Sequence, residues 1–188
     1  MNNYKITEGG RVADSSKYTF YNNDTTLKVN NAGLILDFSN VDKMSFTGQY
    51  NYGCFFKAGH YCTFNTQQSC IFNTYSNCTF NTIHDCIFKT LDNCTFNTGD
   101  NCTFMTFNSC TLTVGKNCVL LRQDTDEIIN LRPYQTIKLN DRGIKGYTII
   151  GADLETIEVN GRTYLKTDIN RINADRDLAI AGLKEVKE

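Results

Sequence analysis

Nine cysteines are the residues of this sequence with the most obvious chemical potential, and they recur every eight residues. Their positions are 54, 62, 70, 78, 86, 94, 102, 110 and 118. Disulfides are disfavoured because same-face neighbours on stacked strands hold their Cβ atoms ~4.8 Å apart, against the ~3.8 Å of a disulfide, and because an odd number leaves one thiol unpaired. Metal sites use Cys-x2-Cys pairs or mixed Cys/His sets, which a seven-residue gap does not supply. The spacing therefore predicts no metal site.

A cysteine nucleophile would need a histidine base, and His60 and His84 each lie two residues before a cysteine, in turns. Such a pair requires an exposed cysteine, whereas the pattern predicts a buried one. Asp85, Asp92 and Asp100 fall in turns at different places in the repeat, and the chain carries no Gly-rich phosphate loop or nucleophile elbow. We therefore expect no catalytic residues and no cofactor, with reduced, buried thiols in a reducing compartment.

The cysteines belong to an octapeptide repeat, Cys-x-Phe-x-Thr followed by three turn-type residues, with its clearest copies at Cys62, Cys78 and Cys94. Alternate side chains of a strand point the same way, so Cys, Phe and Thr share one side. The Phe position is filled by Phe56, Phe64, Phe72, Phe80, Phe88, Phe96 and Phe104, then by Leu112 and Leu120. This column of large apolar residues predicts the core.

The residue after each cysteine sorts into two sets when octads two apart are compared. One set leans apolar and the other is all threonine: Phe55, Ile71, Ile87, Thr103 and Val119 against Thr63, Thr79, Thr95 and Thr111. A spacing of 24 residues mixes the two sets, which argues against a three-faced helix and against an intertwined trimer. The sequence therefore predicts an all-β fold, a two-sided parallel β-solenoid with about 16 residues, or two octads, per coil.

Three segments are expected along the chain. Residues 1–53 form an N-terminal cap with degenerate coils, in which Leu36-Asp37-Phe38 and Met44-Ser45-Phe46 repeat the triplet. Residues 54–122 form the octapeptide solenoid, and residues 123–188 form a small, mostly β module that ends in a helix over 173–186. Strands of this module are expected at 127–131, 135–139, 147–150, 156–159 and 162–166.

Two outward surfaces are the candidate binding sites. The first is a partner or dimer interface of apolar residues, because contiguous exposed apolar groups mark interfaces: Phe55, Ile71, Tyr75, Ile87, Leu91, Phe107 and Val119. The alternative is that the C-terminal module covers this sheet. The second surface is a polar face on the other sheet: Thr63, Asn65, Thr79, Asn81, Thr95, Asn97, Thr111 and Thr113.

The Cys-x-Phe triplet on a short-period solenoid resembles pentapeptide-repeat proteins, and it is more similar to the Cys-Phe octad and hexad solenoids of low-GC bacteria and their phages. The resemblance covers Cys54 to Val119 and implies the solenoid architecture. The chain lacks the acidic surface that lets some pentapeptide-repeat proteins imitate DNA, since 19 Lys and Arg balance 20 Asp and Glu.

A net charge of −1 also argues against nucleic acid as a partner, and no apolar run predicts a membrane span or a secretory signal. We expect a non-catalytic macromolecule-binding or scaffold protein in the bacterial cytoplasm that binds a protein or itself, as a dimer. It would be encoded by a phage or mobile element and act on a host protein, as anti-defence and anti-CRISPR inhibitors do. The alternatives are a spike or fibre component of a phage virion, and an ice-binding protein that uses the Thr/Asn face.

Overall fold

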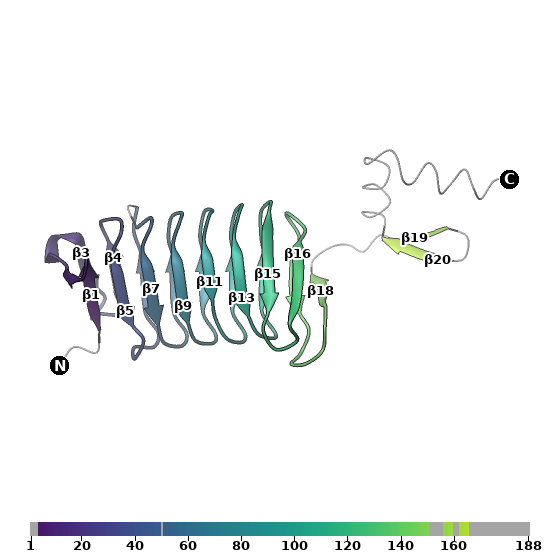
Figure 1. Cartoon of the computed structure of the whole chain (residues 1–188), viewed down its shortest axis with the longest axis horizontal. Coiled ribbons are helices and arrows are strands. Elements are labelled where there is room, and N and C mark those ends of the chain that lie inside the picture. Colours follow the sequence, from purple (N-terminus) through teal and green to yellow (C-terminus); the bar gives the residue numbers. More distant parts are fainter. Residues whose placement is uncertain (1–3, 50, 151–155, 160–161, 166–188) are drawn as a thin grey trace. The chain divides into compact units, whose positions relative to one another are not determined.

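The structure is a computed structural model that describes residues 4–49, 51–150, 156–159 and 162–165 (Figure 1). Within these residues the regular structure is β, apart from one 3₁₀ turn at Ser15–Lys17. The chain divides into two compact units, Met1–Ile150 and Gly151–Glu188. The helix expected at 173–186 lies outside the described residues.

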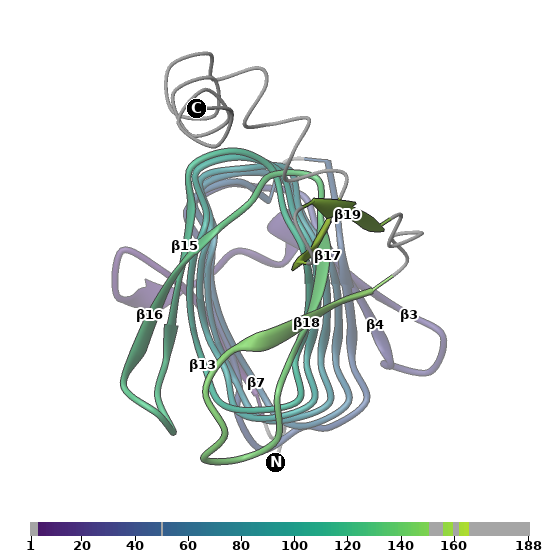
Figure 2. The same ribbon diagram turned by 90° about the vertical axis from the view of Figure 1, so that its right-hand side faces the viewer.

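Consecutive octads of the first unit alternate between two nine-stranded sheets (Figure 2). We call these sheet A and sheet B. The octad strands of sheet A are β7 (Phe55–Ala58), β9 (Ile71–Thr74), β11 (Ile87–Lys89), β13 (Thr103–Thr106) and β15 (Cys118–Arg122). Those of sheet B are β8 (Thr63–Asn65), β10 (Thr79–Asn81), β12 (Thr95–Asn97) and β14 (Thr111–Thr113).

The pairing register sets the length of a coil. Ile87 pairs in parallel with Ile71 on one side and with Thr103 on the other, and Phe80 pairs with Phe64 and Phe96. Every such partner is 16 residues away in the sequence. The two-sided parallel β-solenoid with two octads per coil is therefore confirmed.

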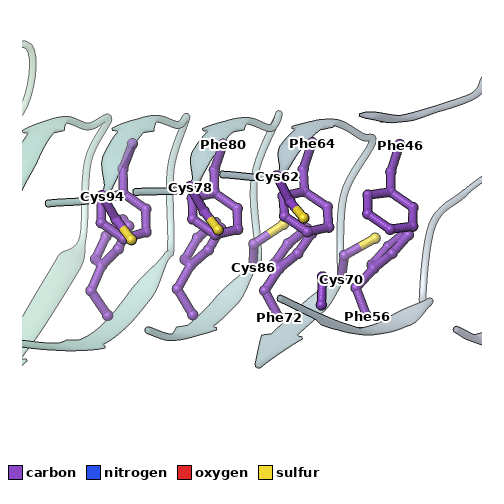
Figure 3. Close-up of a cluster of buried hydrophobic side chains, with 14 of the residues drawn as sticks. Phe46, Phe56, Cys62, Phe64, Cys70, Phe72, Cys78, Phe80, Cys86 and Cys94 are labelled. Carbon is purple, nitrogen blue, oxygen red and sulfur yellow. The ribbon is translucent and has the colours of Figure 1, made fainter. Parts of the chain in front are cut away.

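The interior is a stack of phenylalanine rings, all fully buried (Figure 3). Rings on successive coils of one sheet lie nearly parallel, with centroids 4.8–5.2 Å apart and interplanar angles of 4–7°. Rings from opposite sheets meet edge to face at 5.1–5.6 Å and 70–76°. Both are favoured aromatic geometries, so the Phe column predicted as core is the core.

The turns explain the polar residues between strands. The residue before each cysteine from Cys62 to Cys118 has a left-handed backbone, with φ between 56° and 62°. Five of these eight residues are Asn or Asp, which tolerate this conformation better than other non-glycine residues: Asn77, Asp85, Asn93, Asn101 and Asn117. The turn residue thus reverses the chain and returns the next cysteine to the interior.

At the N-terminal end, parallel coils give way to antiparallel strands. The strands β4 (Thr26–Val29) and β6 (Ser45–Thr47) extend sheet B, and β5 (Ile35–Phe38) extends sheet A. Beyond them β1 (Lys5–Glu8), β2 (Arg11–Val12) and β3 (Tyr18–Tyr21) pair antiparallel and end both sheets.

The upstream triplet is out of phase with the octads. Leu36 pairs with Phe56, and Phe38 pairs with Ala58. Leu36 therefore occupies the core position that the sequence pattern assigned to Phe38. The cause is an insertion, because Leu36 and Phe56 are 20 residues apart instead of 16.

At the C-terminal end, β16 (Glu127–Leu131) pairs antiparallel with β15, and β17 (Thr136–Leu139) pairs antiparallel with β14. The strand β18 (Tyr147–Ile150) then pairs with β17. Residues 123–150 thus continue the two sheets of the solenoid, and the boundary expected after residue 122 lies inside the first unit. In the second unit, β19 (Thr156–Val159) and β20 (Arg162–Leu165) form an antiparallel pair.

Candidate binding surfaces

The outward side of sheet A carries an unbroken column of mostly apolar side chains, which we call the apolar face. Parallel pairing aligns its members on successive strands: Ile35, Phe55, Ile71, Ile87, Thr103 and Val119. Ile71 and Ile87 remain 41% and 40% exposed in the folded chain. Residues 123–150, which were a possible cover, extend the sheets instead.

Sheet B shows that the solenoid itself does not require these apolar side chains. At the equivalent strand position it carries Thr63, Thr79, Thr95 and Thr111, on coils with the same register and the same buried core. Threonine serves this position equally well because β-branched residues suit an exposed strand face. The isoleucines of sheet A therefore call for another explanation, and a covering partner provides one.

A second outward column lies beside the first on sheet A. Its members are Asp37, Lys57, Asn73, Lys89, Met105 and Leu121, and Ile128 of β16 pairs with Leu121. Lys57 approaches Asp37 at 3.5 Å and lies 5.8 Å from the ring centroid of Phe55. The column is thus polar towards the N-terminal end and apolar towards the C-terminal end.

Tyr75, Leu91 and Phe107 lie at the turn that follows each strand of sheet A, and they line a hollow of about 260 Å³ with Asn73 and Lys89. Asn73 and Lys89 also belong to the second column of sheet A. The hollow therefore joins this corner to the sheet, and the predicted residues form a strip from the face to the edge.

His60 supports that corner rather than a reaction. Its ring stacks on Tyr75 with centroids 5.0 Å apart and an interplanar angle of 17°, and its Nδ1 accepts a hydrogen bond from the Ser76 amide at 3.3 Å. This places the imidazole as a brace for the tyrosine.

The outward side of sheet B, which we call the polar face, contains the predicted threonine and asparagine columns in register. One column of hydroxyls is longer than predicted: Thr26, Ser45, Thr63, Thr79, Thr95 and Thr111. In the other column, Asn81 Nδ2 donates to Asn65 Oδ1 at 2.8 Å, and Asn97 Nδ2 donates to Asn81 Oδ1 at 2.9 Å. The amides thus bond along the face and hold one another in fixed rotamers.

Sequence reasoning missed the ends of both faces because they lie outside the octads. Ile35 and Ser45 precede the first cysteine, and Ile128 belongs to an antiparallel strand. Only the insertion of residues between coils, which no spacing rule reveals, brings Ile35 above Phe55.

The cysteines form two buried columns of reduced thiols (Figure 3). Their sulfurs face backbone carbonyl oxygens of the preceding turns: Cys70 Sγ is 2.8 Å from Asn51 O, and Cys78 Sγ is 3.4 Å from Gly59 O. Burial raises the pKa of the Cys54 thiol to about 11 and that of Cys70 to about 12. Thiols in this state are poor nucleophiles and poor metal ligands at neutral pH.

One buried charged group had no counterpart in the sequence analysis. Arg122 is fully buried, and it pairs with Thr106 in an inward column where the octads carry threonine. It binds Asp124 through two hydrogen bonds of 2.8 and 2.9 Å. The only sequence signal was the arginine at an inward strand position.

The described part of the chain contains no helix with the length and hydropathy of a transmembrane span. No protein-family model, no curated protein and no solved structure matches this chain.

Proposed function

We propose that this chain is a non-catalytic binding protein whose apolar face and adjoining corner bind a protein partner. The observation that carries the proposal is the contrast between the two sheets. Equivalent outward positions are threonine on sheet B and exposed isoleucine, phenylalanine or valine at four of five coils on sheet A. One surface is thus suited to water and the other to burial.

The ring stack makes the face a pre-organised surface. Each coil is tied to its neighbours by in-register pairing and by rings about 5 Å apart, such as Phe72 and Phe88. A surface held in its bound shape loses little conformational entropy on association. This favours binding over a function that requires a moving active site.

The chemistry of the interior supports a role without catalysis. The cysteines are buried, and His60 is engaged with Tyr75. The exposed His84 is paired with Asp85 at 2.5 Å on a turn, away from the corner hollow. None of these groups shares a cleft with a second group that would activate it.

We place the partner in a bacterial cell, where a phage or mobile element encoding this chain would direct it against a host protein. The octads support this setting through their resemblance to Cys-Phe solenoids of low-GC bacteria and phages. Reduced thiols in every octad support a reducing cytoplasm. An inhibitor that blocks a host defence protein by occupying its surface would need only the binding face.

A comparative pull-down tests the proposal. The tagged full-length chain, an Ile71→Glu/Ile87→Glu variant and a Thr79→Glu/Thr95→Glu control are exposed to the same bacterial lysate. We expect one protein to be retained by the wild type and the control and lost with the isoleucine variant. Equal retention by all three would contradict binding through the apolar face.

A second function, ice binding, is favoured by the hydroxyl column of the polar face. It extends in register over six strands, from Thr26 to Thr111, and the adjoining asparagines are locked by their mutual hydrogen bonds. A flat, uncharged and regular array matches a crystalline lattice of water. Thermal hysteresis that is abolished by Thr79→Tyr would support this function, and its absence in the wild type would reject it.

A further inference from the structure

We propose that two copies of this chain associate through their apolar faces, with the solenoid axes antiparallel and a two-fold axis running parallel to the strands, between β9 and β11. The inference rests on the surface of the proposed function and names its occupant as a second copy. It follows from the spacing, the charges and the area of that surface.

The spacing of the face suits another face of the same kind. In-register pairing sets Ile71 and Ile87 one strand apart, and the buried rings behind them repeat at 5.0 Å, from Phe72 to Phe88 and from Phe88 to Phe104. Sheets pack face to face with nearly aligned strands when their outward side chains interdigitate. A second copy presents the same repeat over the same length.

The two-fold axis decides which columns meet. An axis parallel to the strands keeps each residue's position along the strand, so the isoleucine column of one copy lies on that of the other. Ile71 then faces Ile87 of the second copy, and Phe55 faces Thr103. An axis parallel to the solenoid would reverse the strand direction and set the isoleucines against the column that contains Lys57 and Lys89.

The charges favour the same arrangement. About an axis between β9 and β11, Lys89 faces Asn73 of the second copy, and Lys57 faces Met105. Lys57 also keeps its own partner Asp37 at 3.5 Å. No charged side chain of the second column meets a like charge, whereas direct apposition of lysines would cost free energy.

The area indicates a weak, reversible dimer. From β5 to β15 the face covers five strand spacings, and with about four residues per strand it measures roughly 24 Å by 13 Å. With side-chain relief and the adjoining corner, two faces bury on the order of 1,000 Å², the lower limit of specific interfaces. We therefore expect dissociation in the micromolar range.

Sedimentation equilibrium of the full-length chain across the micromolar range tests the inference. We expect a concentration-dependent dimer for the wild type and for Thr79→Glu/Thr95→Glu, and a monomer for Ile71→Glu/Ile87→Glu. Ile71→Thr/Ile87→Thr is a gentler variant, because it places on sheet A the residue that sheet B already carries, and it should weaken the dimer at least tenfold without lowering the melting temperature by more than a few degrees. A wild-type monomer at all concentrations, or a dimer that only the sheet B variant disrupts, would overturn the inference.

Mixed single variants test the orientation. In the antiparallel dimer, Ile71→Glu mixed with Ile87→Lys brings opposite charges together, whereas Ile71→Glu mixed with Ile71→Lys sets each charge against an isoleucine. The first mixture should associate more tightly, and the reverse order would refute the antiparallel axis. A monomeric wild type that still retains a lysate protein through this face would refute only the dimer. A dimer that retains no lysate protein would refute only the foreign partner.

Discussion

Arg122 and Asp124 form an enclosed ion pair at the C-terminal end of the solenoid, with Nε 2.8 Å from Oδ1 and Nη2 2.9 Å from Oδ2. The remaining guanidinium hydrogens donate to the carbonyl oxygens of Asn140, Asp141, Ile144 and Gly146 at 2.6–3.1 Å. The second carboxylate oxygen also accepts from the Gly143 amide at 2.9 Å. One buried arginine therefore holds the loop between β17 and β18 against the last coil.

Replacing Arg122 with methionine should destabilise the first unit by about 3–5 kcal/mol, because it leaves the Asp124 carboxylate and several carbonyls buried without their partner. Urea denaturation followed by circular dichroism measures the change. The matched control is Lys57→Met, which removes an ion pair whose side chains are 38% and 39% exposed and should cost less than about 1 kcal/mol. Similar losses for both variants would show that the buried clasp has no special role.

Phe80→Ala should cost about 3–5 kcal/mol, since it opens a cavity within a continuous stack of rings. Phe80 is fully buried and contacts Phe64, Phe96, Phe72 and Phe88. Phe55→Ala is the control, because Phe55 lies half-buried on the outward side, and its loss should be clearly smaller. Equal costs would contradict the assignment of Phe80 to the interior.

Gly99→Ala should destabilise the chain by about 1–3 kcal/mol through overpacking. A Cβ at Gly99 would lie 1.9 Å from the carbonyl oxygen of Ile83 on the preceding coil, so the backbone would have to shift. Gln67→Ala changes the same octad position and should leave the melting temperature nearly unchanged. A tolerated Gly99→Ala would mean that the coils slide apart at little cost.

The octad spacing was sufficient to predict the solenoid because one interaction dominates it. Each Phe such as Phe80 must stack on the Phe 16 residues away, so period, coil length and core follow from the same residues. The positions of Leu36 and Arg122 did not follow. Leu36 depends on an insertion that shifts the phase, and Arg122 depends on a loop 18–24 residues later that folds back over it.

The extent of the solenoid was also beyond the repeat. The strands β16, β17 and β18 continue the sheets without any octad, because they pair antiparallel and need only alternation. The candidate faces were predictable over Cys54 to Val119, where outward positions follow from the phase of the cysteines. Beyond that range Ile35, Ser45 and Ile128 join them through pairing alone.

The nine thiols should be unreactive in the folded chain and accessible only on unfolding. All are buried and reduced, and a protonated buried thiol reacts slowly with disulfide reagents. Titration with a chromogenic disulfide at neutral pH should count close to zero thiols in buffer and nine in denaturant. Rapid reaction of one or more thiols in buffer, with the circular dichroism spectrum unchanged, would contradict the closed core.

Stability should fall at alkaline pH because unfolding releases protons from these thiols. Burial raises the folded pKa of Cys54 to about 11 and of Cys70 to about 12, whereas an exposed thiol titrates near pH 8.5. The unfolded chain therefore binds fewer protons than the folded chain above about pH 8.5, and each such thiol lowers the free energy of unfolding by about 1.4 kcal/mol per pH unit until its folded pKa is reached. The contribution is fully present below pH 8.5 and is lost as the pH rises towards 11 or 12. Urea midpoints measured from pH 7 to pH 10 test this, with Cys70→Ala as the matched variant, because removing one thiol should make the slope shallower by one proton. Identical slopes for wild type and variant would show that Cys70 ionises as readily in the folded chain as in the unfolded one.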